Sequence, residues 1–343
     1  MKTLTITRPD DWHTHVRNGV VLKTVLPHTA RQFARAIIMP NLKPPVTTVA
    51  QALAYREEIL QAVPAGTDFT PLMTLYLTGS TTPTEIKLAA ESEHIYAFKL
   101  YPAGATTNSD SGVADIKAIY PLLAAMEKHD IPLLIHGEVT DDLCDIFDRE
   151  RVFIESSLTP IVDNFPSLRI VLEHVTTTEA VQFVQAAGQN IAATITPQHL
   201  LFNRNALLAC GIRPHYYCLP IIKREHHRLA LVAAATSGNP KFFLGTDSAP
   251  HLTSLKETAC GCAGCYSAHA ALEFYAEVFE RTGSLDKLEG FASFYGADFY
   301  RLPRNSSSVT LEKTSWIVPA AYGKDSLSIT PLKANEELSW KIQ

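Results

Sequence analysis

The alternation of short apolar runs with helix-forming segments constrains the fold of this chain more than any other feature of its sequence. Eight runs rich in β-branched, aromatic and aliphatic residues recur before residue 250, at 12–16, 36–39, 70–77, 97–101, 133–136, 169–174, 192–196 and 241–245. Uninterrupted apolar runs of this kind are typical of parallel strands that are buried on both faces. The segments between them should therefore form the helices that cover a parallel sheet.

Several of these intervening segments carry helix signals. Residues 47–60 are good helix formers, and Thr82 and Thr176 each precede a glutamate by three residues, the spacing of a capping box. A later apolar stripe repeats at i, i+3, i+4 and i+7, and Gly283 is expected to end the helix that it predicts. We therefore expect helices between the apolar runs.

Eight strands that alternate with helices over roughly 250 residues predict a (β/α)8 barrel, an α/β TIM-barrel fold. A doubly wound sheet is the alternative, but no glycine-rich phosphate-binding motif follows the first run. The length of 343 residues is compatible with two domains or one barrel. We expect a single barrel domain over 1–343, in which 305–343 form a C-terminal extension packed on the barrel.

Composition and patterning exclude several classes of protein. With 30 Lys and Arg against 35 Asp and Glu, the net charge is −5, which argues against a nucleic-acid partner. No apolar run approaches the roughly 18 residues of a membrane span, and residues 1–11 lack the apolar core of a secretion signal. Six cysteines are too sparse for a disulfide scaffold, so a cytoplasmic protein is expected.

Polar residues gather where the predicted strands end. His13 and His15 are two apart, so in a strand they share a face, and His136, His174 and Asp247 end or follow later runs. The carboxyl ends of barrel strands form the active-site face of this fold. Imidazole and carboxylate are ligands of zinc, so these five residues predict a metal site.

Lys99 ends the fourth run, where a buried ammonium needs a partner or a task. Three interpretations are open. The amine pairs with a carboxylate, acts as a Schiff-base nucleophile, or adds carbon dioxide to become a carbamate that bridges two metal ions. The third is the most economical beside four histidines, because it converts a cation into an oxygen ligand.

Seven motifs occur in an order that resembles a known family. They are HTHVR, MPN, FKLYP, HGE, EHV, TPQHL and GTDSAPH, and together they resemble the amidohydrolase superfamily and, within it, the dihydroorotase family of the shorter bacterial type. The resemblance covers nearly the whole chain. It implies reversible cyclisation of N-carbamoyl-L-aspartate to L-dihydroorotate in pyrimidine biosynthesis by a homodimeric enzyme acting on a small molecule.

The resemblance also implies a site with two zinc ions. His13, His15 and Asp247 would hold one ion and His136 and His174 the other, with carboxylated Lys99 and a hydroxide as bridges. In the hydrolytic direction the hydroxide attacks, and Asp247 serves as general base and then general acid.

Further residues are implied as substrate contacts. Arg17 suits a substrate carboxylate because guanidinium donates two parallel hydrogen bonds. In the family its partners correspond to Asn41 and His251, with weaker expectations for the backbones of Leu219 and Ala263. The loop after the fourth run would close over the site through Thr106 and Thr107, although Gly104 stands where the family usually has asparagine.

Rival functions remain open at this point. A cyclic amidase for hydantoins or dihydropyrimidines would not need Arg17, a Schiff-base aldolase would centre on Lys99, and a non-catalytic barrel would usually lack some metal ligands. Cys260, Cys262 and Cys265 form either another metal site or, more in keeping with their spacing, reduced thiols in a substrate loop. His199 is either a residue behind the ligands or simply buried, and His226 and His227 are expected in solvent.

Overall fold

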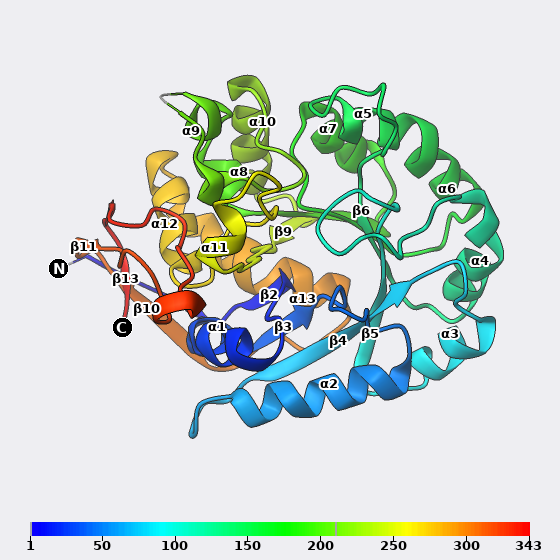
Figure 1. Ribbon diagram of the computed structural model, residues 1–343, viewed down its shortest axis with the longest axis horizontal. Helices are drawn as coiled ribbons and strands as arrows, with labels where there is room; N and C mark the ends of the chain where they lie inside the picture. Colours follow the sequence, from blue (N-terminus) through cyan, green and yellow to red (C-terminus); the bar gives the residue numbers. More distant parts are fainter. Residues whose placement is uncertain (1, 210) are drawn as a thin grey trace.

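The computed structural model describes residues 2–209 and 211–343, and its centre is a parallel eight-stranded sheet curved into a barrel (Figure 1). The strands pair in chain order, and each differs from its predicted run by at most two residues at either end. The predicted (β/α)8 barrel is therefore confirmed. The strands are β2 (Asp10–Thr14), β3 (Arg35–Ile38), β4 (Thr70–Leu77), β5 (Ile95–Leu100), β6 (Leu133–His136), β7 (Ile170–Glu173), β8 (Ile191–Ile195) and β9 (Phe242–Leu244).

The seam between the first and last barrel strands is closed just beyond the end of β9. The amide of Asp247 donates to the carbonyl of His13 at 2.8 Å, and the amide of His15 donates to the carbonyl of Ser248 at 2.9 Å. Below them, the Asp11 carboxylate accepts hydrogen bonds from the amide and hydroxyl of Thr246, at 2.9 and 2.6 Å. Closure thus brings together two segments that lie more than 200 residues apart.

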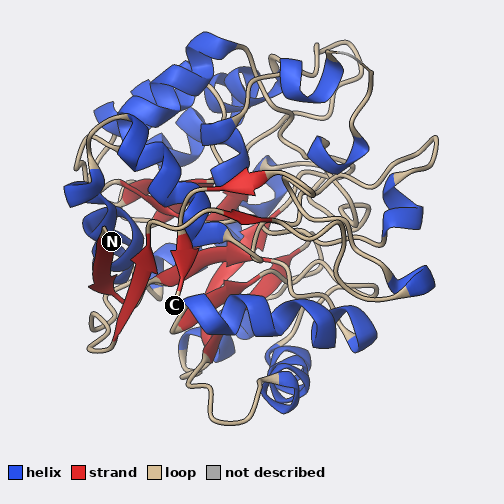
Figure 2. Ribbon diagram, turned by 90° about the vertical axis from the view of Figure 1, so that its left-hand side faces the viewer, coloured by secondary structure: helices blue, strands red, loops and turns tan. Residues whose placement is uncertain are grey.

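Helices surround the strands, as Figure 2 shows in blue around the red barrel. They are α1 (Gly19–Gln32), α2 (Val49–Ala62), α3 (Pro83–Ala90), α4 (Tyr120–Lys128), α5 (Arg149–Phe153), α6 (Thr159–Asn164), α7 (Thr178–Ala186), α8 (Pro197–Leu201), α9 (Asn205–Leu208), α10 (Glu225–Ala235), α11 (Thr253–Lys256), α12 (Ala271–Arg281) and α13 (Tyr295–Phe299). Short 3-10 turns occur at Lys117–Ile119, Pro214–Tyr216, Leu285–Lys287 and Asp325–Leu327, and π-helical turns at Ile154–Leu158 and Gly290–Phe294.

Of the two predicted helix caps, one is confirmed and the other is displaced by one residue. Thr82 caps α3 by accepting from the amide of Glu85, as predicted. For α7 the predicted cap is wrong by one residue: Thr177 accepts from the amide of Ala180, whereas the hydroxyl of Thr176 donates to the buried carboxylate of Glu150 at 2.9 Å. A tertiary partner therefore shifted the start of this helix.

An apolar layer fills the barrel beneath the polar strand ends. Each barrel strand contributes to it, through Trp12, Ile37, Leu72, Ala97, Leu134, Val171, Ala192 and Phe243. The ring of Trp12 stacks on that of Tyr300, with centroids 4.6 Å apart. Gly296 lies so close that a Cβ there would meet the indole nitrogen of Trp12 at 2.0 Å. This layer forms a closely packed apolar floor beneath the residues above it.

The C-terminal segment forms a small sheet with the N-terminal strand, which the sequence did not predict. Strand β1 (Thr3–Thr7) pairs with β10 (Ser308–Glu312), which pairs with β13 (Lys341–Ile342), while β11 (Trp316–Ile317) pairs with β12 (Glu337–Leu338). The amides of Ser339 and Ile342 donate to glutamates of α12. The two ends of the chain consequently lie on the same side of the barrel (Figure 1).

Within the described ranges, none of the helices combines the length and apolar character that crossing a bilayer requires.

Candidate active site

A polar pocket opens at the carboxyl ends of the barrel strands, and most of the predicted site residues line it. It is lined by His13, His15, Arg17, Asn41, Tyr101, Thr106, Thr107, His136, His174, Leu219, Asp247, Ala249, Ala263 and Gly264. Lys99 and His251 are not in this lining but contact residues beside it. The structure therefore brings the predicted residues together from segments spread over the whole barrel.

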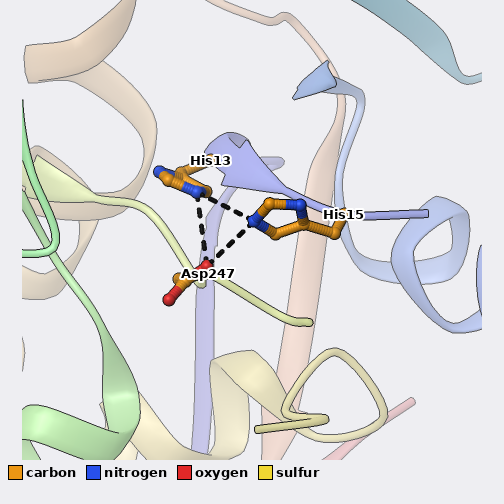
Figure 3. Close-up of side chains that lie close together, drawn as sticks. All are labelled: His13, His15 and Asp247. Carbon is orange, nitrogen blue, oxygen red and sulfur yellow. Dashed lines mark hydrogen bonds and ion pairs between the residues drawn. The ribbon is translucent and has the colours of Figure 1, made fainter. Parts of the chain in front are cut away.

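His13, His15 and Asp247 converge on one point, as Figure 3 shows. The Nε2 atoms of the two histidines are 3.3 Å apart, and Oδ1 of Asp247 lies 3.3 Å from one and 3.2 Å from the other. These atoms form a group able to hold a metal ion. Ligand atoms bound tetrahedrally at about 2.0–2.1 Å from zinc are about 3.3–3.4 Å apart, so this triangle has the size that zinc needs.

His136 and His174 lie next to this triangle. Their rings are 4.8 Å apart, and the ring of His174 is 5.0 Å from that of His13. The second group of potential metal ligands combines His13 and His174 with Glu173, a residue that the sequence analysis did not single out. The signal for Glu173 was its place at the end of β7, directly before His174.

Three of the four histidines that are candidate metal ligands contact an oxygen of another side chain through one of their ring nitrogens. Nδ1 of His13 lies 3.1 Å from Glu173, Nδ1 of His15 donates to Asn41 Oδ1 at 2.8 Å, and Nε2 of His136 donates to Glu138 at 2.7 Å. Metal-binding histidines nearly always have such a partner, because it fixes the tautomer and the orientation of the ring. Asn41 thus has an orienting contact that its predicted substrate role did not include.

Lys99 is buried beneath the pocket and forms an ion pair with Glu173. Its Nζ also lies 4.8 Å from the centre of the Tyr101 ring. The first of the three interpretations of Lys99, pairing with a carboxylate, describes this unmodified side chain. Burial lowers the pKa of Lys99, although Glu173 opposes the shift.

The electrostatic environment keeps Asp247 ionised. Burial disfavours its charge, but His13 and His15 outweigh burial and hold the pKa of Asp247 well below its usual value. Burial likewise disfavours charge on His13, yet the carboxylates of Glu173 and Asp247 raise its pKa to about 9. For His15, burial and the nearby guanidinium of Arg17 lower the pKa to about 4. The two carboxylates thus favour positive charge at His13, whereas burial and Arg17 disfavour it at His15.

The backbone is strained at three residues of the pocket. Arg17, His174 and Asp247 have φ of 58°, 43° and 43°, in the left-handed region that side chains other than glycine rarely adopt. Each follows the end of a barrel strand, where the chain turns sharply into a loop. Such conformations persist only when the surrounding structure enforces them, and they are concentrated at functional sites.

Arg17 supplies the charge on the cationic side of the pocket, and His251 lies beside it as a neutral imidazole because burial and the guanidinium lower its pKa. Nη2 of Arg17 lies 3.0 Å from Nε2 of His251, and Nε of Arg17 donates to the carbonyl of Pro250 at 3.1 Å. Nη1 lies 3.3 Å from Nδ1 of His15, so the guanidinium stands directly beside the metal-ligand triangle. A small molecule whose anionic group is bound by Arg17 would therefore also reach the metal-ligand triangle.

The loop that follows β5 lies over the pocket. The hydroxyl of Thr107 accepts from the amide of Ala263 at 3.2 Å and lies 3.3 Å from its carbonyl, and the carbonyl of Thr107 accepts from Asn41 at 3.2 Å. Gly104 has φ of 77°, a conformation that glycine adopts without cost and asparagine tolerates better than most residues. The departure from the family pattern at Gly104 is therefore compatible with the loop's backbone.

The remaining histidine and cysteine predictions can be placed as well. His199 is buried and bonded on both ring nitrogens, to Thr196 at 2.7 Å and to the carbonyl of Pro220 at 2.9 Å. His226 is exposed, but His227 is half-buried and accepts from the amide of Thr178, so its expected solvation is wrong.

The cysteines of the 260–265 segment are free thiols, Cys260 exposed and Cys265 buried. Among the residues that the structure describes, the groups able to hold a metal consist of histidines and carboxylates. This supports the interpretation of the cysteines as reduced thiols in a loop at the pocket.

Comparison with known proteins agrees with this geometry. The model of the amidohydrolase family matches residues 6–337, so the chain belongs to the amidohydrolase family. The dihydroorotase of Nitrosococcus oceani is 66% identical over 342 residues, which are 99% of each chain. Within its family the chain is therefore a dihydroorotase, a cyclic amide hydrolase.

Solved structures support the same assignment. The dihydroorotase of Campylobacter jejuni has a TM-score of 0.91 at 35% identity, with 100% of this chain and 98% of that one covered. The dihydroorotase of Saccharomyces cerevisiae, solved in complex with 5-fluoroorotic acid, has a TM-score of 0.92 at 34% identity, with 100% and 99% covered.

Proposed function

We propose that this enzyme catalyses the reversible, zinc-dependent cyclisation of N-carbamoyl-L-aspartate to L-dihydroorotate in pyrimidine biosynthesis. The triangle of His13, His15 and Asp247 carries the proposal, because its edges of 3.2–3.3 Å match the spacing of ligands around a tetrahedral zinc ion. The orienting contacts behind the histidines support it further. Magnesium and calcium prefer sets of oxygen ligands, so this nitrogen-rich set favours zinc.

Two zinc ions per chain fit the donor set. His13, His15 and Asp247 would hold the first ion, and His136 and His174 the second. Because Glu138 occupies Nε2 of His136, the Nδ1 atom of that ring is the one left to bind metal. Bound zinc lowers the pKa of water and polarises the substrate carbonyl.

Carboxylated Lys99 would bridge the two ions. The lysine is buried directly beneath the histidines, and the carbamate would form when its neutral amine attacks carbon dioxide and releases a proton. The product is an anion, so Glu173 would then turn towards His13, which already lies 3.1 Å away.

Asp247 would transfer the proton. It is ionised and lies in the centre of the site, so in the hydrolytic direction it takes a proton from the attacking water and later delivers it to the leaving ring nitrogen. In the biosynthetic direction the same steps run in reverse.

Substrate binding follows from the cationic side of the pocket. Arg17 and His251 would bind the carboxylate of the substrate, with Asn41 and the backbones of Leu219 and Ala263 completing the contacts. Thr106 and Thr107 would seal the site, since the loop that carries them already reaches Ala263. A carboxylate-bearing ring is consistent with the 5-fluoroorotic acid complex of the yeast relative.

The proposal also covers the domain organisation, the cellular location and the oligomeric state of the chain. We expect residues 1–343 to act as one domain in a cytoplasmic homodimer that has neither nucleic-acid nor membrane partners.

The test combines metal analysis with an assay of dihydroorotate hydrolysis. Two zinc ions per chain, loss of activity with a chelator and recovery with zinc are expected, while hydantoin and dihydrouracil should be poor substrates because they lack the carboxylate. Lys99→Ala should bind less zinc unless a small carboxylic acid replaces the carbamate. Full zinc content in this variant without such an acid would contradict the bridging role.

A further inference from the structure

Lys256, the last residue of α11, is a buried lysine whose ammonium group donates hydrogen bonds to backbone carbonyls and lies 5.7 Å from the centre of the Tyr217 ring. Its Nζ donates to the carbonyl oxygens of Tyr217 at 2.8 Å, Cys262 at 2.8 Å and Gly264 at 2.7 Å. An ammonium group has three hydrogens, so all of its donors are used. Within the described residues it lies in no salt bridge with a carboxylate, which is unusual for a buried lysine.

The three carbonyls belong to two separate segments of the pocket wall. Tyr217 precedes Leu219 by two residues, and Cys262 and Gly264 flank Ala263, while Leu219, Ala263 and Gly264 all line the pocket. A hydrogen bond from the amide of Gly264 to the carbonyl of Tyr217, at 2.9 Å, joins the two segments directly. Lys256 therefore connects both segments from behind.

Ala263 is also where the loop over the pocket meets the cationic side. Its carbonyl lies 3.1 Å from Nε2 of His251, and its amide donates to the hydroxyl of Thr107 at 3.2 Å. His251 in turn contacts Arg17. A displacement of Ala263 would consequently disturb both the covering loop and the group that receives the substrate carboxylate.

We propose that Lys256 is a positioning residue for substrate binding, which holds the backbones of Leu219 and Ala263 at the distance that the anionic end of the substrate requires. This inference rests on the proposed function. Lys256 acts through these backbones and does not itself touch the substrate.

The physical reason lies in the carbonyls that would lose their donor. Among the described residues, the carbonyls of Cys262 and Gly264 have Lys256 as their hydrogen-bond donor, whereas that of Tyr217 also accepts from Gly264. Buried carbonyls without a partner are costly, so segment 262–264 would move until water reached it. The backbone contacts to a non-reacting carboxylate are present in both ground and transition states, so their loss raises KM more than it lowers kcat.

The experiment compares Lys256→Met with Lys241→Met in dihydroorotate hydrolysis. Lys241 is a matched control, because it is also buried and donates to backbone carbonyls, those of Val184 and Ala187 at the end of α7, away from the pocket. Lys256→Met should raise KM about tenfold with kcat changed by less than about threefold and with unchanged zinc content. Lys241→Met should leave KM unaltered, even where it lowers the melting temperature.

Three results would overturn the inference. They are a folded Lys256→Met enzyme with wild-type KM, an equal rise of KM in Lys241→Met, or a loss confined to kcat. If Lys256→Met does not fold, Lys256→Gln is measured in its place. Its amide keeps two N–H donors, so its KM should lie between the wild-type value and the value expected for Lys256→Met. A wild-type protein that does not hydrolyse dihydroorotate would instead refute the proposed function.

Discussion

Replacement of Arg17 by methionine tests the proposed substrate specificity most directly. Methionine keeps much of the length of the side chain but removes the guanidinium, and with it the contacts to His251 at 3.0 Å and to the carbonyl of Pro250 at 3.1 Å. Burial lowers the pKa of Arg17, but its usual value is so high that the group stays charged. The variant therefore removes one positive charge from the side of the pocket that would receive the substrate carboxylate.

The size of the effect follows from the bonds that the guanidinium can make. Each hydrogen bond to a charged group contributes about 1.5–3 kcal/mol, and a guanidinium can form two with one carboxylate. The loss should thus reach about 3–6 kcal/mol, or about a 10²–10⁴-fold decrease in kcat/KM for dihydroorotate. Arg17→Lys keeps the charge without the paired geometry, so its kcat/KM should fall between those of wild type and Arg17→Met.

The assay must separate substrate binding from damage to the metal site, because Nη1 of Arg17 lies 3.3 Å from Nδ1 of His15. Zinc content is therefore measured on the same samples. Arg228→Met serves as the control, since Arg228 pairs with Glu225 on the surface of α10 and should leave kcat/KM unchanged. A fully zinc-loaded Arg17→Met enzyme with kcat/KM near that of wild type would refute the assignment of the carboxylate to Arg17.

Three other predictions test separate parts of the structure. Asp247→Asn should retain zinc but lose about 10²–10⁴-fold in kcat, because the proton acceptor is gone; turnover near that of wild type in a single-turnover assay would exclude its role as general base. Gly296→Ala should lower the free energy of unfolding by about 1–3 kcal/mol in urea titrations, because a Cβ would collide with Trp12, and an unchanged midpoint would contradict the packing. Burial lowers the pKa of His269 to about 3, so the unfolded chain takes up a proton first as the pH falls below 6.5. Stability should then fall by about 1–2 kcal/mol between pH 6.5 and 5, and this fall should be smaller in His269→Leu; equal slopes for the two proteins would refute the argument.

The barrel and the approximate place of the site could be predicted because both leave local marks in the sequence. Strands buried on two faces must be apolar along their length, and a polar residue at the end of such a run is conspicuous. His136, for example, ends β6 at the predicted residue. Family motifs then extended the prediction to residues such as His251 and Thr107, which no periodicity would have selected.

Tertiary structure alone decided which of these side chains meet. The triangle exists because the chain closes its barrel between β2 and the segment after β9, so that Asp247 hydrogen-bonds the backbone of His13. The partners of the histidines, such as Glu173, depend on the direction of each ring and carry no spacing rule in the sequence. The pairing of β1 with β10, which the sequence did not predict, likewise depends on how distant segments of the chain pack together.

Sequence by itself thus determined the fold class, the order of the strands and the strand ends that carry the chemistry. Only the folded chain decided that Glu173 faces Lys99, that Thr177 rather than Thr176 caps α7, and that Lys256 holds two segments of the pocket wall. The physical reason is that local patterns record whether a residue is buried, whereas contacts between distant residues depend on how the whole barrel packs.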